Sequence, residues 1–539
     1  MSTATTFPGA LAPARPRTNK WLVTISVTFG TLMGAIDASI VNVALPHMRG
    51  AVGATLQEIT WVTTGFAIAT VIVMPLTAFL GRLFGQKRVY MASLLLFVVS
   101  SALCGMAWSL PSLVLFRVLQ GFGAGALQPT EQAILRQTFP PEEQGLAMAL
   151  FAMAVMIGPA VGPTLGGWIV DNVHWSWIFF INLPVGALGL FMVGSFVHEP
   201  DDIRAANAAA AAHQRKNMDW LGIALLALGL AALQFFLEEG QQKDWFQSGL
   251  IVACALLAVV ALALFVWREL VAPVPAVNVR LFKDPLFASG TLIGAVMFAI
   301  LLASMFLLPV FMQELLGFTA MQSGLALMPR TLVMMAVTPI VGRLYGKVSP
   351  RLLIAAGITC VALGAFDVSR VTLQTTARGI IDAILIQGVG FSLLFVPLTT
   401  AALSQIPRTR LADATGLNSL LRQVGASMGL AIFATILSRH AVQAKAAIAA
   451  HVALDRPEVQ ARLGALVAGF QAKGFGPVEA NEAALRALDG TVTRQAMVLS
   501  FQHVLALTGF LFLCVLPLLY FLEVNKRAAS QRPHLEMET

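Results

Sequence analysis

The sequence is poor in charged residues and in motifs that mark an enzyme. Asp, Glu, Lys and Arg make up 12% of its 539 residues, whereas hydrophobic residues make up 57%. Soluble domains carry about 25% charged residues, so this composition excludes an ordinary soluble domain. The sequence has no HExxH motif and no GxxxxGK[ST] phosphate loop. We therefore predict no enzyme, no catalytic residues, no metal, no cofactor and no ATP site.

Cysteine is also scarce. The four cysteines are Cys104, Cys254, Cys360 and Cys514, and none lies near another at the spacing of a metal site. All four fall in apolar stretches, which favours small apolar packing residues over a redox role.

Long apolar runs dominate the sequence instead. A bilayer core is about 30 Å thick, so each spanning helix needs roughly 20 apolar residues. The runs between charge clusters predict about fourteen such helices, and hence an all-α integral membrane protein in a lipid bilayer. They lie near residues 21–45, 57–80, 89–108, 111–133, 145–170, 175–197, 218–237, 247–267, 286–313, 322–342, 352–369, 378–401, 414–437 and 497–522.

Basic residues favour the loops on one side of the predicted membrane. Fourteen spans place both ends of the chain on that same side. The short loops on the other side carry only Arg49, Lys243, Arg370 and Arg378. The positive-inside rule therefore predicts cytoplasmic termini. The net charge of +8 follows from this topology, and it indicates no nucleic-acid partner.

A few charged residues fall within the predicted spans, where charge is costly and usually functional. Asp37 and Arg117 lie deepest. Arg330 lies about nine residues into its span, from where a long side chain can still reach the interface. Arg422 is the third intramembrane arginine. Acidic residues nearer to span ends, for which interfacial and functional roles both remain open, are Glu131, Asp367 and Asp382.

Two loops repeat each other, and this repeat predicts the domain organisation. FLGRLFGQKRVYMAS (79–93) and IVGRLYGKVSPRLLIAAG (340–357) share Gly-Arg-Leu, an aromatic residue, glycine and basic residues. Two six-helix halves follow if spans seven and eight are an insert, and half-repeats around a central site are typical of transporters. The predicted parts are a cytoplasmic tail (1–20), an N-terminal bundle (21–197), a linker (198–217), an inserted pair (218–267), a linker (268–285), a C-terminal bundle (286–522) with a long periplasmic loop (438–496), and a second cytoplasmic tail (523–539).

Several motifs together resemble the major facilitator superfamily, and within it the 14-span drug:proton antiporter family of EmrB/QacA type. LMGAIDASIVNVALP contains Asp37 and resembles that family's opening motif. RVLQGFGAGALQP (117–129) resembles its fourth-span motif, with Arg117 as the arginine. IGPAVGPTLGGW resembles the fifth-span antiporter motif. The segments 218–246, 416–432 and 493–504 resemble the inserted pair and the late spans. The match covers nearly the whole chain.

The resemblance implies a proton-coupled multidrug exporter of the bacterial inner membrane that works by alternating access. It assigns proton coupling to Asp37 and Arg117. It also implies a tripartite system with a periplasmic adaptor protein and an outer-membrane channel, for which the loop 438–496 is a docking surface or only a solvated cap. One departure stands out. Arg82 occupies the place where relatives carry an aspartate, so a charge relay there is weakened or built differently.

The fifth-span motif predicts a gate. Its residues are Gly158, Pro159, Gly162, Pro163 and Gly166. Glycines four residues apart let another helix approach closely, and prolines bend or loosen a membrane helix. We expect this face to pack against the second half and seal one entrance. Tight packing without gating is the alternative.

We expect small lipophilic substrates to bind between the halves, with neutral or acidic compounds favoured over cations by Arg422. The candidate residues are Met33, Gln120, Gln128, Phe298, Phe306, Gln387, Phe391, Asn418, Arg422 and Gln423. Two other functions fit the same fold, an exporter of one specific metabolite and a proton-coupled importer. A membrane-embedded enzyme or receptor fits less well. Within 438–496, the stretches AVQAKAAIAAHVAL and DRPEVQARLGALVAGFQA predict amphipathic helices, which the stretch GFGP ends.

Overall fold

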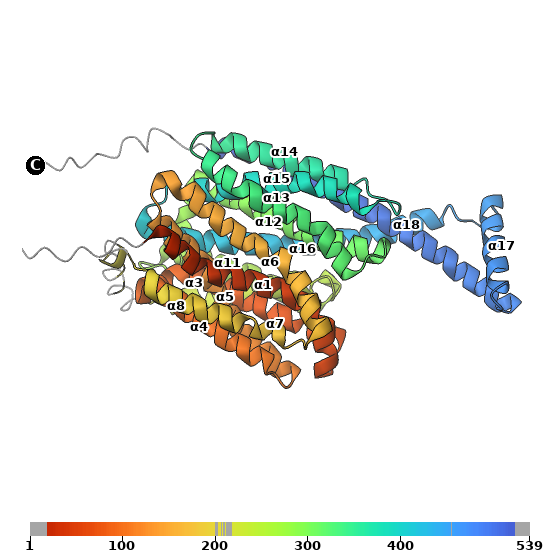
Figure 1. Cartoon of the computed structure of the whole chain (residues 1–539), viewed down its shortest axis with the longest axis horizontal. Helices are drawn as coiled ribbons and strands as arrows, with labels where there is room; N and C mark the ends of the chain where they lie inside the picture. Colours follow the sequence, from red (N-terminus) through yellow and green to blue (C-terminus); the bar gives the residue numbers. More distant parts are fainter. Residues whose placement is uncertain are drawn as a thin grey trace, which may run out of the picture.

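The chain forms a bundle of long helices (Figure 1). The computed structural model describes residues 19–199, 203–205, 207, 211, 218–453 and 455–522. In these residues fourteen helices are long and apolar enough to cross a membrane, which confirms the all-α membrane protein. Each coincides with one predicted span. The predicted tails lie almost wholly outside the described residues, and most of the linker 198–217 does too.

The first six spans form the N-terminal half, and short helices connect some of them. Proline, serine and threonine begin several of these helices; for example, Ser109 caps α5 just before Pro111. The elements are α1 (Lys20–Val52), α2 (Leu56–Ile59), α3 (Trp61–Phe84), α4 (Gln86–Gly105), α5 (Leu110–Thr138), η1 (Pro141–Glu143), α6 (Gln144–Asn172), α7 (Trp177–Phe180) and α8 (Asn182–Phe196).

The next two spans form the predicted insert, and the last six form the C-terminal half. The insert consists of α10 (Trp220–Glu239), η2 (Trp245–Gln247) and α11 (Gly249–Val271), and η3 (Val279–Lys283) follows it. The C-terminal half consists of α12 (Pro285–Val310), a π-helical turn η4 (Phe311–Leu315), α13 (Ala320–Leu344), α14 (Pro350–Val368), α15 (Ala377–Ala402), η5 (Arg408–Arg410), α16 (Leu411–Ala449), α17 (Pro457–Gln471), α18 (Pro477–Leu513) and η6 (Leu516–Phe521).

The two halves repeat one packing pattern. In the N-terminal half α1 packs on α6, and α5 packs on α3 and α4. In the C-terminal half α12 packs on α16, and α15 packs on α13 and α14. The halves meet along two seams, α3 with α16 and α6 with α13, and α10 packs over the first of these. The two similar loops 79–93 and 340–357 therefore join matching pairs of helices in the two halves, α3 to α4 and α13 to α14.

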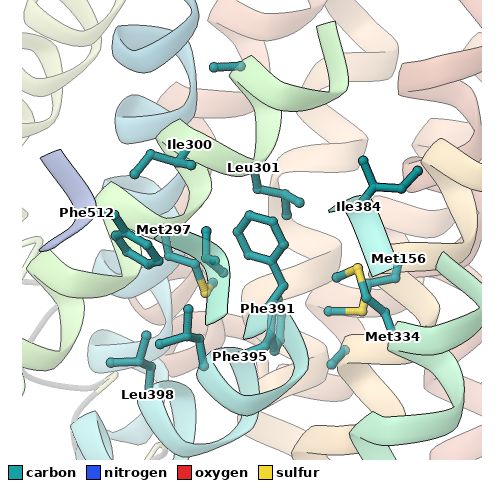
Figure 2. Packing of buried hydrophobic residues seen from close by; sticks show 14 of the residues in the cluster. Met156, Met297, Ile300, Leu301, Met334, Ile384, Phe391, Phe395, Leu398 and Phe512 are labelled. Carbon is teal, nitrogen blue, oxygen red and sulfur yellow. The ribbon is translucent and has the colours of Figure 1, made fainter. Parts of the chain in front are cut away.

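The apolar core continues across the boundary between the halves. Figure 2 shows Met156 of α6 beside Met334 of α13, near Phe391 and Phe395 of α15. All four are buried in one hydrophobic cluster. Phe395 also lies 6.1 Å, between ring centroids, from Phe151 of α6. Dispersion contacts of this kind hold the two halves together.

Two helices run well past the expected span ends. The sequence predicted a loop over 438–496, but α16 continues to Ala449 and α18 already begins at Pro477. The reason lies in the sequence, because the alanine-rich stretch after 438 contains no proline or glycine before Ala449. The stretch 457–471 forms α17 as predicted, and its partly buried apolar side packs on α18.

This projection, residues 438–496, is called the arm below. It extends from one end of the bundle (Figure 1). The end with the arm is called the distal end, and the end at which α1 begins is called the terminal end.

Candidate functional site

A buried ion pair lies inside the N-terminal half. Asp37 of α1 is 0% exposed and Arg117 of α5 is 1% exposed. The Arg117 Nη1 donates to Asp37 Oδ2 at 2.6 Å. The sequence predicted both residues as functional, and the structure brings them together.

Four further groups surround this pair, and the six together are called the coupling cluster below. Gln120 Nε2 and Asn182 Nδ2 both donate to Asp37 Oδ1, at 3.0 and 3.2 Å. Arg117 also donates from Nε to the Val62 carbonyl at 3.1 Å, and its guanidinium lies 4.1 Å from the Phe66 ring centre. Burying a charge pair requires such additional hydrogen bonds. Four helices, α1, α3, α5 and α8, thus meet at one carboxylate.

A second cluster lies at the boundary between the halves. Arg422 of α16 is 6% exposed, and its Nη2 donates to Gln132 Oε1 of α5 at 3.1 Å. The guanidinium lies 5.4 and 5.5 Å from the ring centres of Phe298 and Phe395. Gln132 in turn donates to Ser419 Oγ at 3.4 Å. The faces of the two aromatic rings partly compensate this buried cation.

The C-terminal half holds a counterpart of the coupling cluster without a carboxylate. The stretch IQGVG (386–390) in α15 matches LQGFG (119–123) in α5, so Gln387 corresponds to Gln120. Arg330 of α13 donates from Nη1 to Ser304 Oγ at 3.0 Å, and Ser304 donates to Gln387 at 3.4 Å. Arg330 is 1% exposed, so its side chain does not reach the interface.

Polar contacts close the boundary at the terminal end. Arg82 of α3 donates from Nη1 to both carboxylate oxygens of Asp413 of α16, each at 2.8 Å. Arg136 donates to the Thr400 carbonyl at 3.1 Å, and Arg408 donates to the Gln137 carbonyl at 3.0 Å. The departure noted at Arg82 is therefore explained: an arginine–aspartate pair joins the halves at this position.

The fifth-span motif packs differently from our expectation. Its glycines lie on α1 of the same half and not on the second half: Gly158 faces Ala35, Gly162 faces Ser39, and Gly166 faces Ile40. Ser39 Oγ donates to the Gly158 carbonyl at 2.8 Å. Pro163 continues the helix, and the side chain of Pro159 lies outside the described part of α6. The motif thus fixes α6 to the stretch of α1 that carries Asp37.

The α6 helix still contacts the second half, through its other faces. Gly145 at its start and Gly342 near the end of α13 meet backbone to backbone, with 2.6 Å between the Gly342 carbonyl oxygen and an added Gly145 Cβ. This contact closes the α6–α13 seam at the terminal end.

The predicted substrate residues fall in several environments. Gln120 belongs to the coupling cluster, Gln387 to its counterpart, and Phe298 and Arg422 to the boundary cluster. Met33, Phe391 and Asn418 are buried, Gln128 and Gln423 are half-buried, and Phe306 is 46% exposed. Their role in binding stays a prediction.

Sequence reasoning missed several residues of these clusters. Asn182, Gln132, Phe395 and Asp413 carry the contacts, but uncharged or common side chains do not stand out within apolar spans. For Gln387, the repeat of QGxG was a signal that sequence analysis could have used.

The three other acidic candidates from the sequence differ in their exposure. Glu131 is 0% exposed, whereas Asp367 and Asp382 are exposed.

The four cysteines are free. The GASMG stretch (425–429) has the spacing of a hydrolase elbow, but it lies inside α16, where Gly425 and Gly429 pack on α12 and Ser427 accepts from Gln234.

Two similar six-helix halves with polar clusters inside and between them define a membrane transporter, not an enzyme. The chain belongs to the Major Facilitator Superfamily, whose family model matches residues 27–430. It is similar to the multidrug export protein EmrB of Haemophilus influenzae, with 38% identity over 414 residues that cover 76% of this chain and 79% of that protein.

Other relatives cover more of the chain. The fatty acid resistance protein FarB of Neisseria gonorrhoeae is 32% identical over 92% of this chain and 95% of its own. The EmrB protein of Escherichia coli K12 is 32% identical over 93% of this chain and 94% of its own.

Two solved structures share the fold. The proton:xylose symporter XylE matches with a TM-score of 0.59 and 12% identity, covering 92% of this chain and 95% of that one. The human organic anion transporter MFSD10 matches with a TM-score of 0.55 and 13% identity, covering 92% and 99%.

Proposed function

We propose that this protein is a proton-coupled exporter of lipophilic small molecules in the bacterial inner membrane, with both termini in the cytoplasm. The multidrug export relatives and the excess of Lys and Arg in the loops at the terminal end support this assignment. Transport proceeds by alternating access, in which the two halves rock about the boundary between them. The six-plus-six repeat and the two seams support that motion.

The observation that carries the proposal is the buried Asp37–Arg117 pair. A proton that binds Asp37 from outside removes the carboxylate charge and weakens its hold on Arg117, Gln120 and Asn182. Release of that proton inside restores the pair. Because α6 is packed tightly on α1 next to Asp37, a rearrangement there is passed to the α6–α13 seam.

The energy of this exchange is sufficient for export. One charge that crosses 100 mV releases about 2.3 kcal/mol, and this supports roughly a 50-fold gradient of a neutral substrate.

Buried arginines support acidic or neutral lipophiles as substrates. Arg136, Arg330 and Arg422 are each at most 6% exposed, and none forms an ion pair among the described residues. A buried guanidinium without a carboxylate is costly, and an anionic substrate would reduce that cost. The similarity to a fatty acid resistance protein favours a narrower second candidate, an exporter of one lipophilic carboxylate.

The arm supports assembly with a periplasmic adaptor protein and, through it, an outer-membrane channel. It projects from the distal end, which the proposed orientation places in the periplasm. Its α17 helix has no fully buried residue, so its outer side is available to a partner.

Proteoliposomes with an internal pH dye test the coupling. We expect a lipophilic weak acid to trigger proton movement in the native protein and not in Asp37→Asn. Asp367→Asn, an exposed carboxylate on α14, is the matched control and should behave as native. Equal proton movement in native protein and Asp37→Asn would refute Asp37 as the carrier.

A further inference from the structure

A second carboxyl group is buried inside the N-terminal half, and the coupling cluster does not use it. Glu131 of α5 is 0% exposed. Its Oε1 accepts one hydrogen bond, from Thr28 Oγ1 of α1 at 3.2 Å, and its Oε2 has no hydrogen-bond partner. No ion pair is recorded for Glu131 in the part of the chain that the structure describes.

The nearest described basic residues along α1 and α5 form no ion pair with this carboxyl. Lys20 of α1 pairs with Glu143. Arg136, five residues further along α5, donates from Nη2 to Gln144 and to a backbone carbonyl of α15, and its Nε and Nη1 have no hydrogen-bond partner among the described residues. Tyr90 of α4, whose phenol lies near Glu131, donates its hydroxyl to the Val27 carbonyl.

An ionised carboxylate in such a place would be buried without a cation, with only the hydroxyls of Thr28 and Thr31 beside it. Groups in that situation take up a proton and become neutral. Asp37 differs, because Arg117, Gln120 and Asn182 all stabilise its charge. The surroundings of Asp37 therefore suit a charged carboxylate, whereas those of Glu131 suit a neutral carboxyl group.

The two carboxyl groups lie at different depths. Gln120, which binds Asp37, and Glu131 are eleven residues apart on α5, which is about 16 Å along one face of the helix. Leu127 lies between them, is buried, and packs over Gly30 of α1. Glu131 is thus nearer to the terminal end and is separated from Asp37 by apolar side chains.

The position of Glu131 ties it to the closing of the terminal end. Its neighbour Gln132 bonds across the boundary to Arg422 and Ser419. When the halves separate at this level, that turn of α5 loses its partners and meets water. A hydrated carboxyl can release its proton, which the dry, closed state prevents.

We propose that Glu131 is a second proton-coupling residue, which binds a proton when the terminal end closes and releases it to water when that end opens. This proposal rests on the proposed function and adds to it a proton site separate from the carrier. The sign follows from linkage: the protonated form belongs to the closed state, so low pH favours closure and rising pH favours opening. In the proposed orientation, the less acidic cytoplasm would promote opening toward the cytoplasm.

The test measures closure without substrate. Spin labels at Phe84→Cys and Gly346→Cys, exposed positions at the terminal ends of α3 and α13, report the distance between the halves. The native cysteines are replaced beforehand. In native protein we expect the open fraction to rise with pH, by up to tenfold per pH unit. Glu131→Gln is a permanently neutral mimic of the protonated form. In this variant the distance between the labels should keep its closed-state value at every pH.

Two control variants complete the design. Glu269→Gln removes another 0% exposed carboxyl, on α11 of the insert, and should retain the native pH response. Thr28→Val keeps the carboxyl and removes the hydrogen bond that Thr28 donates to it, so this variant should keep the slope of the pH response and shift its midpoint. It also serves as the test if Glu131→Gln does not fold. A native response in Glu131→Gln, or an unshifted midpoint in Thr28→Val, would overturn the proposal.

This experiment separates the two proposals. Asp37→Asn should keep the pH response of closure while it loses substrate-driven proton movement. If Asp37→Asn retains full coupling, Asp37 is not the carrier, whatever Glu131 does. If Asp37→Asn loses coupling but Glu131→Gln keeps the native pH response of closure, the proposed function stands and the second proton site is refuted.

Discussion

Arg82 and Asp413 join the two halves of the protein by two hydrogen bonds of 2.8 Å at the terminal end. Such charge-assisted bonds contribute about 1.5–3 kcal/mol, so their loss should raise the open fraction by roughly 10- to 150-fold. We predict that Asp413→Asn lengthens the distance between spin labels at Phe84→Cys and Gly346→Cys. The exchanged pair Arg82→Asp/Asp413→Arg should restore the native distance. An unchanged distance in Asp413→Asn, or a distance that stays long in the exchanged pair, would contradict a locking role.

The coupling cluster should show strong energetic interaction between its two charges. Asp37→Asn leaves the Arg117 guanidinium buried without a counter-charge. Arg117→Gln leaves the Asp37 carboxylate buried without a counter-charge. Each single change should lower the free energy of unfolding by about 3–5 kcal/mol, while the double variant should lose less than the sum. Thermal unfolding in detergent measures this cycle, and additive losses would show that the pair is not coupled.

The glycine face of α6 should tolerate no larger side chain. In Gly162→Val the new atoms would overlap Ser39 on α1, so we expect a loss of about 1–3 kcal/mol in stability and reduced transport. Gly167→Val is the matched control, because nothing lies within 4 Å of its Cβ position. Unfolding temperature and vesicle flux give the comparison; native flux in Gly162→Val would remove any gating role from the motif.

The boundary cluster should select substrates by charge. We predict that Arg422→Gln reduces export of a lipophilic carboxylate at least tenfold and leaves export of its methyl ester nearly unchanged, because only the acid uses the guanidinium. Arg439→Gln, an exposed arginine on the same helix, is the control. Flux of both compounds into inverted vesicles is the measurement. Equal losses for acid and ester would indicate a structural role for Arg422.

The arm should be dispensable for transport and required for assembly. Replacing residues 450–476 with a short Gly/Ser linker removes α17 and keeps all fourteen spans. We expect native flux in proteoliposomes and loss of drug resistance in cells, with co-purification of the adaptor protein as the direct readout. Retained resistance and adaptor binding would assign the arm no docking role.

Sequence reasoning reached the fold because span length is set by membrane thickness, which leaves apolar runs easy to recognise. It also found Asp37 and Arg117, since charge inside a span is costly and therefore conspicuous. It did not find Asn182 or Gln132, whose polar side chains act only through neighbours brought close by the fold. The partner of the Gly158–Gly166 face was wrong for the same reason, because glycine spacing shows that a helix approaches closely but not which helix it is.

The length of α16 has a mechanical consequence. Its 39 residues form a rod about 58 Å long, which begins beside the Arg82–Asp413 contact at the terminal end and finishes in the arm. The tip lies about 40 Å along the helix from Arg422, so a turn of about 15° about that level, as in known rigid-body switches, moves the tip by roughly 10 Å. Because the helix is continuous, a small rotation inside the membrane produces a larger displacement of its end outside the membrane. A protein bound at the tip would therefore move when the transporter changes between its inward-facing and outward-facing conformations.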